Sequence, residues 1–130
     1  MKGEIKMRKG FTLLELIIVI VILGILATLG FSQYTKMVER GRAAEARMVL
    51  GQMRTAAIAY HQEFTAWPTA ISDMSVSAGG CDATHHFGYA SAGTLGTATR
   101  CTAGQNGKSA GPAYSITLDY NLGSLTTGGY

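Results

Sequence analysis

An almost uninterrupted run of apolar residues begins at Phe11 and ends at Phe31. A helix needs about 20 apolar residues to cross the hydrocarbon core of a bilayer, and this run has 21 residues. No charged side chain occurs from Leu16 onward within it, so it is too uniform for the amphipathic helix of a soluble domain. The pattern predicts a transmembrane helix over residues 11–31.

The helical pattern continues beyond this run, but with only one apolar side. Apolar residues recur every three or four positions, as one face of an α-helix requires; they are Ala46, Leu50, Met53, Ala57, Tyr60 and Phe64. Because no proline occurs between Phe11 and Trp67, we expect one helix from about Phe11 to about Phe64, with residues 32–66 as its amphipathic half. Pro68 then forces the residue before it toward an extended conformation.

The remaining residues, 67–130, are rich in glycine and predict a small head of loops and short strands. The strongest strand pattern runs from Tyr114 to Tyr120, where apolar and polar residues alternate. Weaker candidates are His86–Ala90 and Thr94–Cys101. Three such strands could form an antiparallel sheet that covers the apolar stripe of the helix. The predicted fold class is therefore α+β, with a long N-terminal helix packed against a small sheet.

Positive charge is concentrated before the apolar run. Residues 1–10 hold four basic side chains and one acidic one, which accounts for the whole net charge of +3. Lysine and arginine clusters mark the cytoplasmic side of a membrane span, so we expect the C-terminal part to be exported. Residues 11–130 carry seven basic and seven acidic side chains, a balance that gives no support to a nucleic-acid surface as the main role.

Glu15 is the one carboxylate inside the predicted span. An unpaired charge in a membrane costs on the order of a few kcal/mol, so such residues usually have a partner and a function. The alternative is that Glu15 only reaches to the membrane interface, since it lies close to the start of the run.

Two cysteines, Cys81 and Cys101, lie in the part expected to be exported. In an oxidising compartment an even number of cysteines favours one disulfide over two free thiols. Two cysteines at this spacing are not a recognisable zinc site.

The segment Gly10-Phe11-Thr12-Leu13-Leu14-Glu15, after a short basic leader and before an apolar helix, resembles the N-terminal signature of type IV pilins and type II secretion pseudopilins. Gly24-Ile25-Leu26-Ala27 and Gln33-Tyr34 match as well. The resemblance implies the pilin fold, with residues 1–10 as a leader that a membrane aspartyl peptidase removes between Gly10 and Phe11. It also implies N-methylation of the new Phe11 amine, and it makes this chain a substrate of processing and not an enzyme.

The function that the resemblance implies is that of a structural subunit, polymerised through its N-terminal helix into a type IV pilus or a similar filament. Its partners would be further copies of itself, the prepilin peptidase, an assembly platform and an ATPase, with no cofactor. It would wait as a single-pass protein of the inner membrane and end in an extracellular pilus. The alternatives are a pseudopilin in a periplasmic filament and a minor pilin acting as adhesin or in DNA uptake.

The resemblance also suggests a partner for Glu15. Cleavage creates a cation at the new N-terminus on Phe11, methylation keeps its charge, and this cation can pair with Glu15 of the same or a neighbouring subunit. One departure concerns Ser32, where the family commonly has proline. The helix of assembled pili is often unwound between the glycine matching Gly24 and that proline, so unwinding and a continuous helix both remain open here.

Other candidate sites in the sequence are weaker. His85 and His86 point in opposite directions in an extended segment, which favours a solvated loop over a metal site. Asp73, Asp82 and Asp119 could bind calcium, but their spacing fits no known loop motif, and we expect no metal site. Trp67 is expected in the core at the junction of helix and sheet. No arrangement of residues suggests an active site.

Overall fold

The computed structural model describes residues 10–81, 85–102 and 111–129. In this part of the chain one α-helix is followed by a short 3-10 helix and four strands. By their contacts the residues divide into two compact units, Met1–Val38 and Glu39–Tyr130.

Helix α1 extends from Leu13 to Phe64 and contains 52 residues. Thr12 caps its start, since the Thr12 Oγ1 accepts a hydrogen bond from the N–H of Glu15 at 3.2 Å. The helix ends where Thr65 takes a positive φ of 54°, three residues before Pro68. The prediction of one continuous helix is confirmed, and its first residue lies two positions later than predicted.

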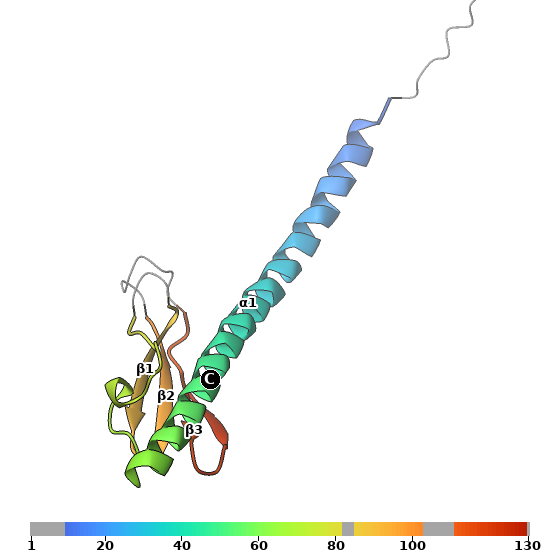
Figure 1. The fold of residues 1–130 in the computed structure, drawn as a ribbon. Helices are drawn as coiled ribbons and strands as arrows, with labels where there is room; N and C mark the ends of the chain where they lie inside the picture. Colours follow the sequence, from blue (N-terminus) through green and yellow to red (C-terminus); the bar gives the residue numbers. More distant parts are fainter. Residues whose placement is uncertain (1–9, 82–84, 103–110, 130) are drawn as a thin grey trace, which may run out of the picture. The chain divides into compact units, whose positions relative to one another are not determined.

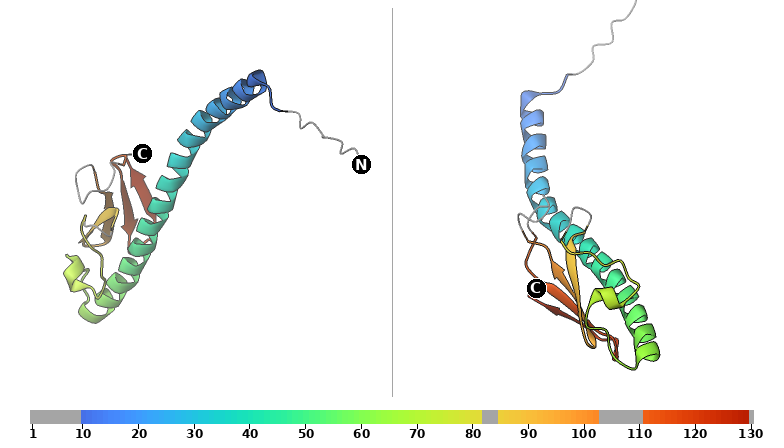
Figure 2. Two further views of the ribbon diagram at one scale, coloured as in Figure 1. Left: turned by 90° about the horizontal axis from the view of Figure 1, so that it is seen from above. Right: turned by 60° about the vertical axis from the view of Figure 1, so that its left-hand side comes forward.

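Four strands form one antiparallel sheet in the order β1-β2-β3-β4. They are β1 (Phe87–Ala92), β2 (Leu95–Arg100), β3 (Ser115–Asp119) and β4 (Leu125–Gly128). Figures 1 and 2 show the second half of α1 lying along one face of this sheet. The predicted α+β fold class is thus confirmed, and the strongest predicted strand corresponds to β3.

The three predicted strands correspond to β1, β2 and β3, but the predicted number was too low, because β4 is a fourth. All four residues of β4 are exposed, and among the described strands it pairs with β3 alone, as Leu118 with Leu125 and Ser115 with Gly128. A strand at the edge of a sheet with no buried side has no alternating pattern of apolar residues, so β4 could not be predicted from such a pattern.

The core lies between the second half of α1 and the sheet. Four residues of the predicted stripe are fully buried there: Ala46, Leu50, Met53 and Ala57. The sheet side supplies Phe87, Tyr89, Ala98, Tyr114, Ile116, Leu118 and Tyr120. The end of the stripe was predicted wrongly, because Tyr60 is only half-buried and Phe64 is 55% exposed. Their rings pack on each other with centroids 4.6 Å apart.

Between α1 and β1 the chain forms the 3-10 helix η1 (Ile71–Asp73). Pro68 is buried before it, and Trp67 packs against the core. The Trp67 ring stacks on His61 with centroids 4.3 Å apart and planes 4° apart. Trp67 therefore lies at the junction of helix and sheet, as the sequence predicted.

Candidate functional site

The residues before α1 leave the backbone around Gly10 accessible. The side chain of Phe11 is 86% exposed, and a Cβ atom built on Gly10 would meet no atom within 4 Å. Among the described residues, nothing therefore covers the Gly10–Phe11 peptide bond.

Glu15 lies in the first turn of α1 and is exposed. An acidic side chain at this end of a helix is favourable, because the free backbone N–H groups carry partial positive charge. No ion pair joins Glu15 to another residue within the described ranges. A role for Glu15 between chains thus stays a prediction.

The first part of α1 has an apolar surface on all sides. From Leu13 to Phe31 its large apolar side chains are between 46% and 76% exposed. By length and composition α1 could cross a membrane, and none of its most apolar stretch is buried within the chain. An exposed apolar surface of this size normally marks a region that lipid or another protein covers.

The helix is continuous between Gly24 and Ser32. Serine and threonine hydroxyls in this region donate hydrogen bonds to carbonyl oxygens one turn earlier. The Ser32 Oγ donates to the Leu29 oxygen at 3.1 Å, and the Thr28 Oγ1 donates to the Ile25 oxygen at 2.7 Å. Such bonds satisfy the hydroxyl within the helix but also offer the carbonyl an alternative partner.

Cys81 and Cys101 form a disulfide with a Cα–Cα distance of 5.7 Å, the pairing that the cysteine count favoured. It closes a loop of 20 residues and ties the segment before β1 to the end of β2. On the chain-entropy model such a loop contributes about 3 kcal/mol to the free energy of unfolding.

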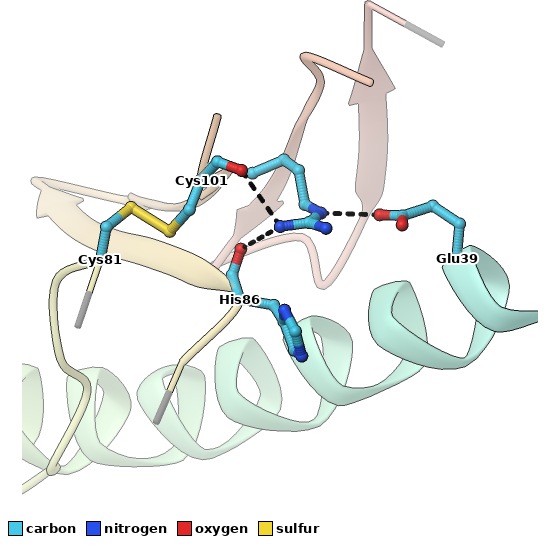
Figure 3. The surroundings of a disulfide bond; sticks show 5 residues. Glu39, Cys81, His86 and Cys101 are labelled. Carbon is cyan, nitrogen blue, oxygen red and sulfur yellow. Dashed lines mark hydrogen bonds and ion pairs between the residues drawn. A yellow bond between two sulfur atoms is a disulfide. The ribbon is translucent and has the colours of Figure 1, made fainter. Parts of the chain in front are cut away.

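A buried ion pair beside this disulfide connects α1 to the sheet (Figure 3). Arg100, the last residue of β2, donates from its Nε to the Glu39 Oε1 at 2.7 Å. The hydroxyl of Tyr114 donates to the same oxygen at 3.0 Å, and Arg42 donates to the Glu39 Oε2 at 3.1 Å. The side chain of Arg100 has no exposed surface and that of Glu39 is 10% exposed.

Arg100 also fixes the strands around the disulfide. Its Nη1 donates to the carbonyl oxygens of His86 at 3.0 Å and Cys101 at 3.1 Å. The guanidinium lies 5.7 Å from the centroid of the Phe87 ring, within the range of a cation–π contact. One side chain thus links the helix, β1 and the disulfide.

The surroundings of Glu39 favour its charged form. Burial raises the pKa of Glu39, but the hydrogen bonds from Arg100, Tyr114 and Arg42, together with the charge of Arg100, outweigh it. The pKa of Glu39 therefore lies below its usual value of 4.5.

This lowered pKa predicts how stability depends on pH. The pKa of Glu39 is lower in the folded than in the unfolded chain. Its contribution to the free energy of unfolding is therefore present above about pH 4.5 and is lost as the pH falls through the pKa of the folded state. Lowering this pKa by one unit adds about 1.4 kcal/mol to the free energy of unfolding. Urea denaturation of the protein in detergent, followed by the fluorescence of Trp67, should show this loss. Glu39→Gln should abolish that part of the pH dependence, and an unchanged pH dependence in this variant would contradict the assignment.

The other candidates from the sequence have local structural contacts. Asp73 accepts hydrogen bonds from the N–H groups of Thr69 and Ala70, which hold its pKa below the usual value. Asp119 accepts from the backbone of the turn after β3. Asp82 lies outside the described residues. Within the described ranges no group of three or more His, Cys, Asp or Glu side chains could hold a metal ion.

Sequence reasoning missed the ion pair of Glu39 with Arg100. The two residues are 61 positions apart, and a single glutamate on a helix normally indicates an exposed face. The available signal was that Arg100 is one of only four charged residues from position 75 to position 130. An arginine next to a cysteine, in a head with so few charges, is a reasonable candidate for a buried partner.

A family model described as the prokaryotic N-terminal methylation motif matches residues 5–31. The match includes Gly10, Phe11, Glu15 and the exposed apolar part of α1 from Leu13 to Phe31. It covers neither the ion pair of Glu39 nor any residue of the head.

Three curated proteins illustrate the relationship of the chain to known sequences. Fimbrial protein EcpC of Eikenella corrodens is 36% identical over 73 residues, which are 56% of this chain and 48% of that protein. Type IV major fimbrial protein FimA of Dichelobacter nodosus is 46% identical over 50 residues, 38% of this chain and 32% of that protein. Type IV major pilin protein PilE1 of Neisseria gonorrhoeae is 37% identical over 62 residues, 48% of this chain and 38% of that protein. The alignments thus span between about a third and a half of the length of these relatives.

Proposed function

Because the chain carries the N-terminal methylation motif and is related to type IV fimbrial proteins in part of its length, we propose that it is a structural subunit of a type IV pilus or a similar filament. These relatives are structural pilins and not enzymes. The observation that carries the proposal is the exposed apolar surface of α1 from Leu13 to Phe31, directly after the processing motif. Packed helix against helix, this surface would be removed from water in a polymer.

The first step of the proposed function is removal of residues 1–10 by a membrane aspartyl peptidase. The exposed Gly10–Phe11 bond supports this position, because glycine presents no side chain that could obstruct a protease. Cleavage would take away the basic leader with its charge of +3 and leave a new amine on Phe11, which is then methylated.

The mature protein is accordingly expected to begin with N-methylated Phe11. Mass spectrometry of purified filaments should find an N-terminal peptide that starts at Phe11 and carries one methyl group on its amine, so that its mass exceeds that of the unmodified peptide by CH2. The control is the same chain from cells that lack the peptidase, which should retain residues 1–10. Filaments that contain subunits starting at Met1 would contradict the processing step.

The second step is polymerisation from the membrane. The subunit would be held in the inner membrane by residues 11–31 with its head, residues 67–130, on the outer side, and would then enter the filament. A platform and an ATPase would drive this transfer. In the polymer the Phe11 amine can pair with Glu15 of the same or a neighbouring chain, which would set the register between helices.

A long extracellular pilus and a short periplasmic pseudopilus use the same assembly steps, so microscopy must distinguish them. Electron microscopy of material sheared from cells, with an antibody against the head, is expected to show labelled fibres. Fibres that appear only when the chain is overproduced would favour a pseudopilin. Sparse labelling of fibres made mainly of another subunit would favour a minor pilin.

A further inference from the structure

A hollow of about 320 Å³ opens between α1 and the side of the sheet formed by β3 and β4. Its lining includes the side chains Arg40, Ala43, Arg47, Tyr114, Ile116 and Thr127. The volume lies at the lower end of the range for ligand pockets. It is therefore large enough for an apolar side chain such as leucine together with part of the turn that carries it.

The rim of this hollow is positively charged. Arg40 and Arg47 are exposed and lie seven residues apart, which places them on the same side of α1. Neither makes an ion pair with a residue in the described part of the chain. The charge of Glu39, at one end of the hollow, is already matched by Arg42 and Arg100. An acidic partner would complement the two remaining arginines.

The turn between β3 and β4 presents a leucine next to an acidic residue. Leu122 is 76% exposed, although its backbone is held in place. The Asp119 Oδ1 accepts hydrogen bonds from the N–H groups of Asn121 and Leu122, both at 2.9 Å. The N–H of Gly123 donates to the Asp119 carbonyl oxygen at 2.8 Å. A turn fixed in this way loses little conformational freedom when its leucine is bound.

The turn and the hollow lie at different points along one side of α1. Arg54 holds the turn, since its Nε donates to the Tyr120 carbonyl oxygen at 2.9 Å and a Cβ on Gly123 would lie 3.0 Å from its guanidinium. Arg54 is seven residues after Arg47, on the same side of the helix. At 1.5 Å per residue, Arg54 lies about 10 Å along the axis from Arg47, the helix residue of the hollow that is nearest to it. Leu122 is therefore presented well away from the hollow of its own chain.

From this arrangement we propose that Leu122 of one copy of the chain inserts into the hollow of a second copy, with Asp119 facing Arg40 and Arg47 of that copy. The contact joins two different surfaces, and contacts of this kind repeat in one direction instead of closing in a symmetric pair. Opposite charges on the two surfaces fix the register of docking. The inference rests on the proposed function, because it names the contact between heads in the polymer.

Photo-crosslinking in the assembled polymer tests this contact. Leu122 of the full chain is replaced by benzoylphenylalanine, and sheared filaments are irradiated. The expected product is a covalent dimer whose peptides join position 122 to the segment Ala43–Arg47 or to the segment with Tyr114 and Ile116. The matched control places the same probe at Leu95, which is 42% exposed on β2 and should not reach that hollow. Dimers that map to other segments, or no dimer from intact filaments, would overturn the inference.

A charge exchange supplies a second test that needs no probe. Leu122→Lys is expected to lower the filament yield about tenfold, because it brings like charges together across the contact. Arg47→Glu in the same chain should restore the yield. Normal filaments from Leu122→Lys, or a double variant as poor as the single one, would contradict the contact. If the unaltered chain forms no filaments, the proposed function itself fails.

Discussion

Replacement of Glu15 by alanine is expected to give a subunit that is processed and held in the membrane but does not enter filaments. In the proposed polymer, Glu15 pairs with the amine of Phe11 away from water. Removing one partner of a buried pair typically costs about 3–5 kcal/mol, which lowers an association constant by about two to four orders of magnitude. The measurement compares subunit in sheared filaments with subunit in the membrane fraction.

Two further variants make the Glu15 experiment specific. Glu15→Gln keeps the size of the side chain and removes its charge, so it should fail like alanine if the charge is what matters. Glu45→Gln removes an exposed charge further along α1 and should leave the yield unchanged. Mass spectrometry must show that each variant still begins at Phe11, which separates a defect in assembly from one in processing. A normal filament yield from Glu15→Ala would reject the proposed role.

The sequence predicted the parts of the fold that depend on local patterns. Helix α1 followed from an apolar run, a stripe at helical spacing and the absence of proline. Strand β3 followed from the alternation that ends at Tyr120, whose side chain is fully buried. In both cases burial on one side produces a periodic pattern of apolar residues in the sequence. Strand β4 has no buried residue, so it has no such pattern.

The candidate sites divide in a similar way. The N-terminal methylation motif is a contiguous segment, and the resemblance to it could be recognised from the residues Gly10 to Glu15. The ion pair of Glu39 with Arg100 depends on the return of β2 to the helix, 61 residues later. The scarcity of charge around Arg100 marks it as a candidate for burial, but nothing near Glu39 identifies it as the partner. Long-range pairing of this kind becomes visible only when the fold brings the two side chains together.

Replacement of Arg100 by methionine is expected to destabilise the head more than any change on its surface. Met removes the guanidinium and leaves the carboxylate of Glu39 buried, with Arg42 and the hydroxyl of Tyr114 as its remaining partners. Breaking a buried pair in this way costs about 3–5 kcal/mol, against about 5–15 kcal/mol for the stability of a whole domain. The carbonyl oxygen of Cys101 also loses a donor. The free energy of unfolding should be measured for the full chain in detergent by urea denaturation.

The fluorescence of Trp67 suits this measurement, because it is the only tryptophan of the chain and packs against the core. Arg40→Met is the matched control, since it removes an exposed arginine from α1 and should change the free energy of unfolding by less than about 0.5 kcal/mol. The double variant Glu39→Leu, Arg100→Met should recover part of the lost stability, because apolar residues often replace a buried pair at little cost. A decrease of less than about 1 kcal/mol in the free energy of unfolding of Arg100→Met would mean that the apolar core alone holds the sheet on the helix. The larger loss, with recovery in the double variant, would show that the ion pair makes its own contribution to holding the sheet on the helix.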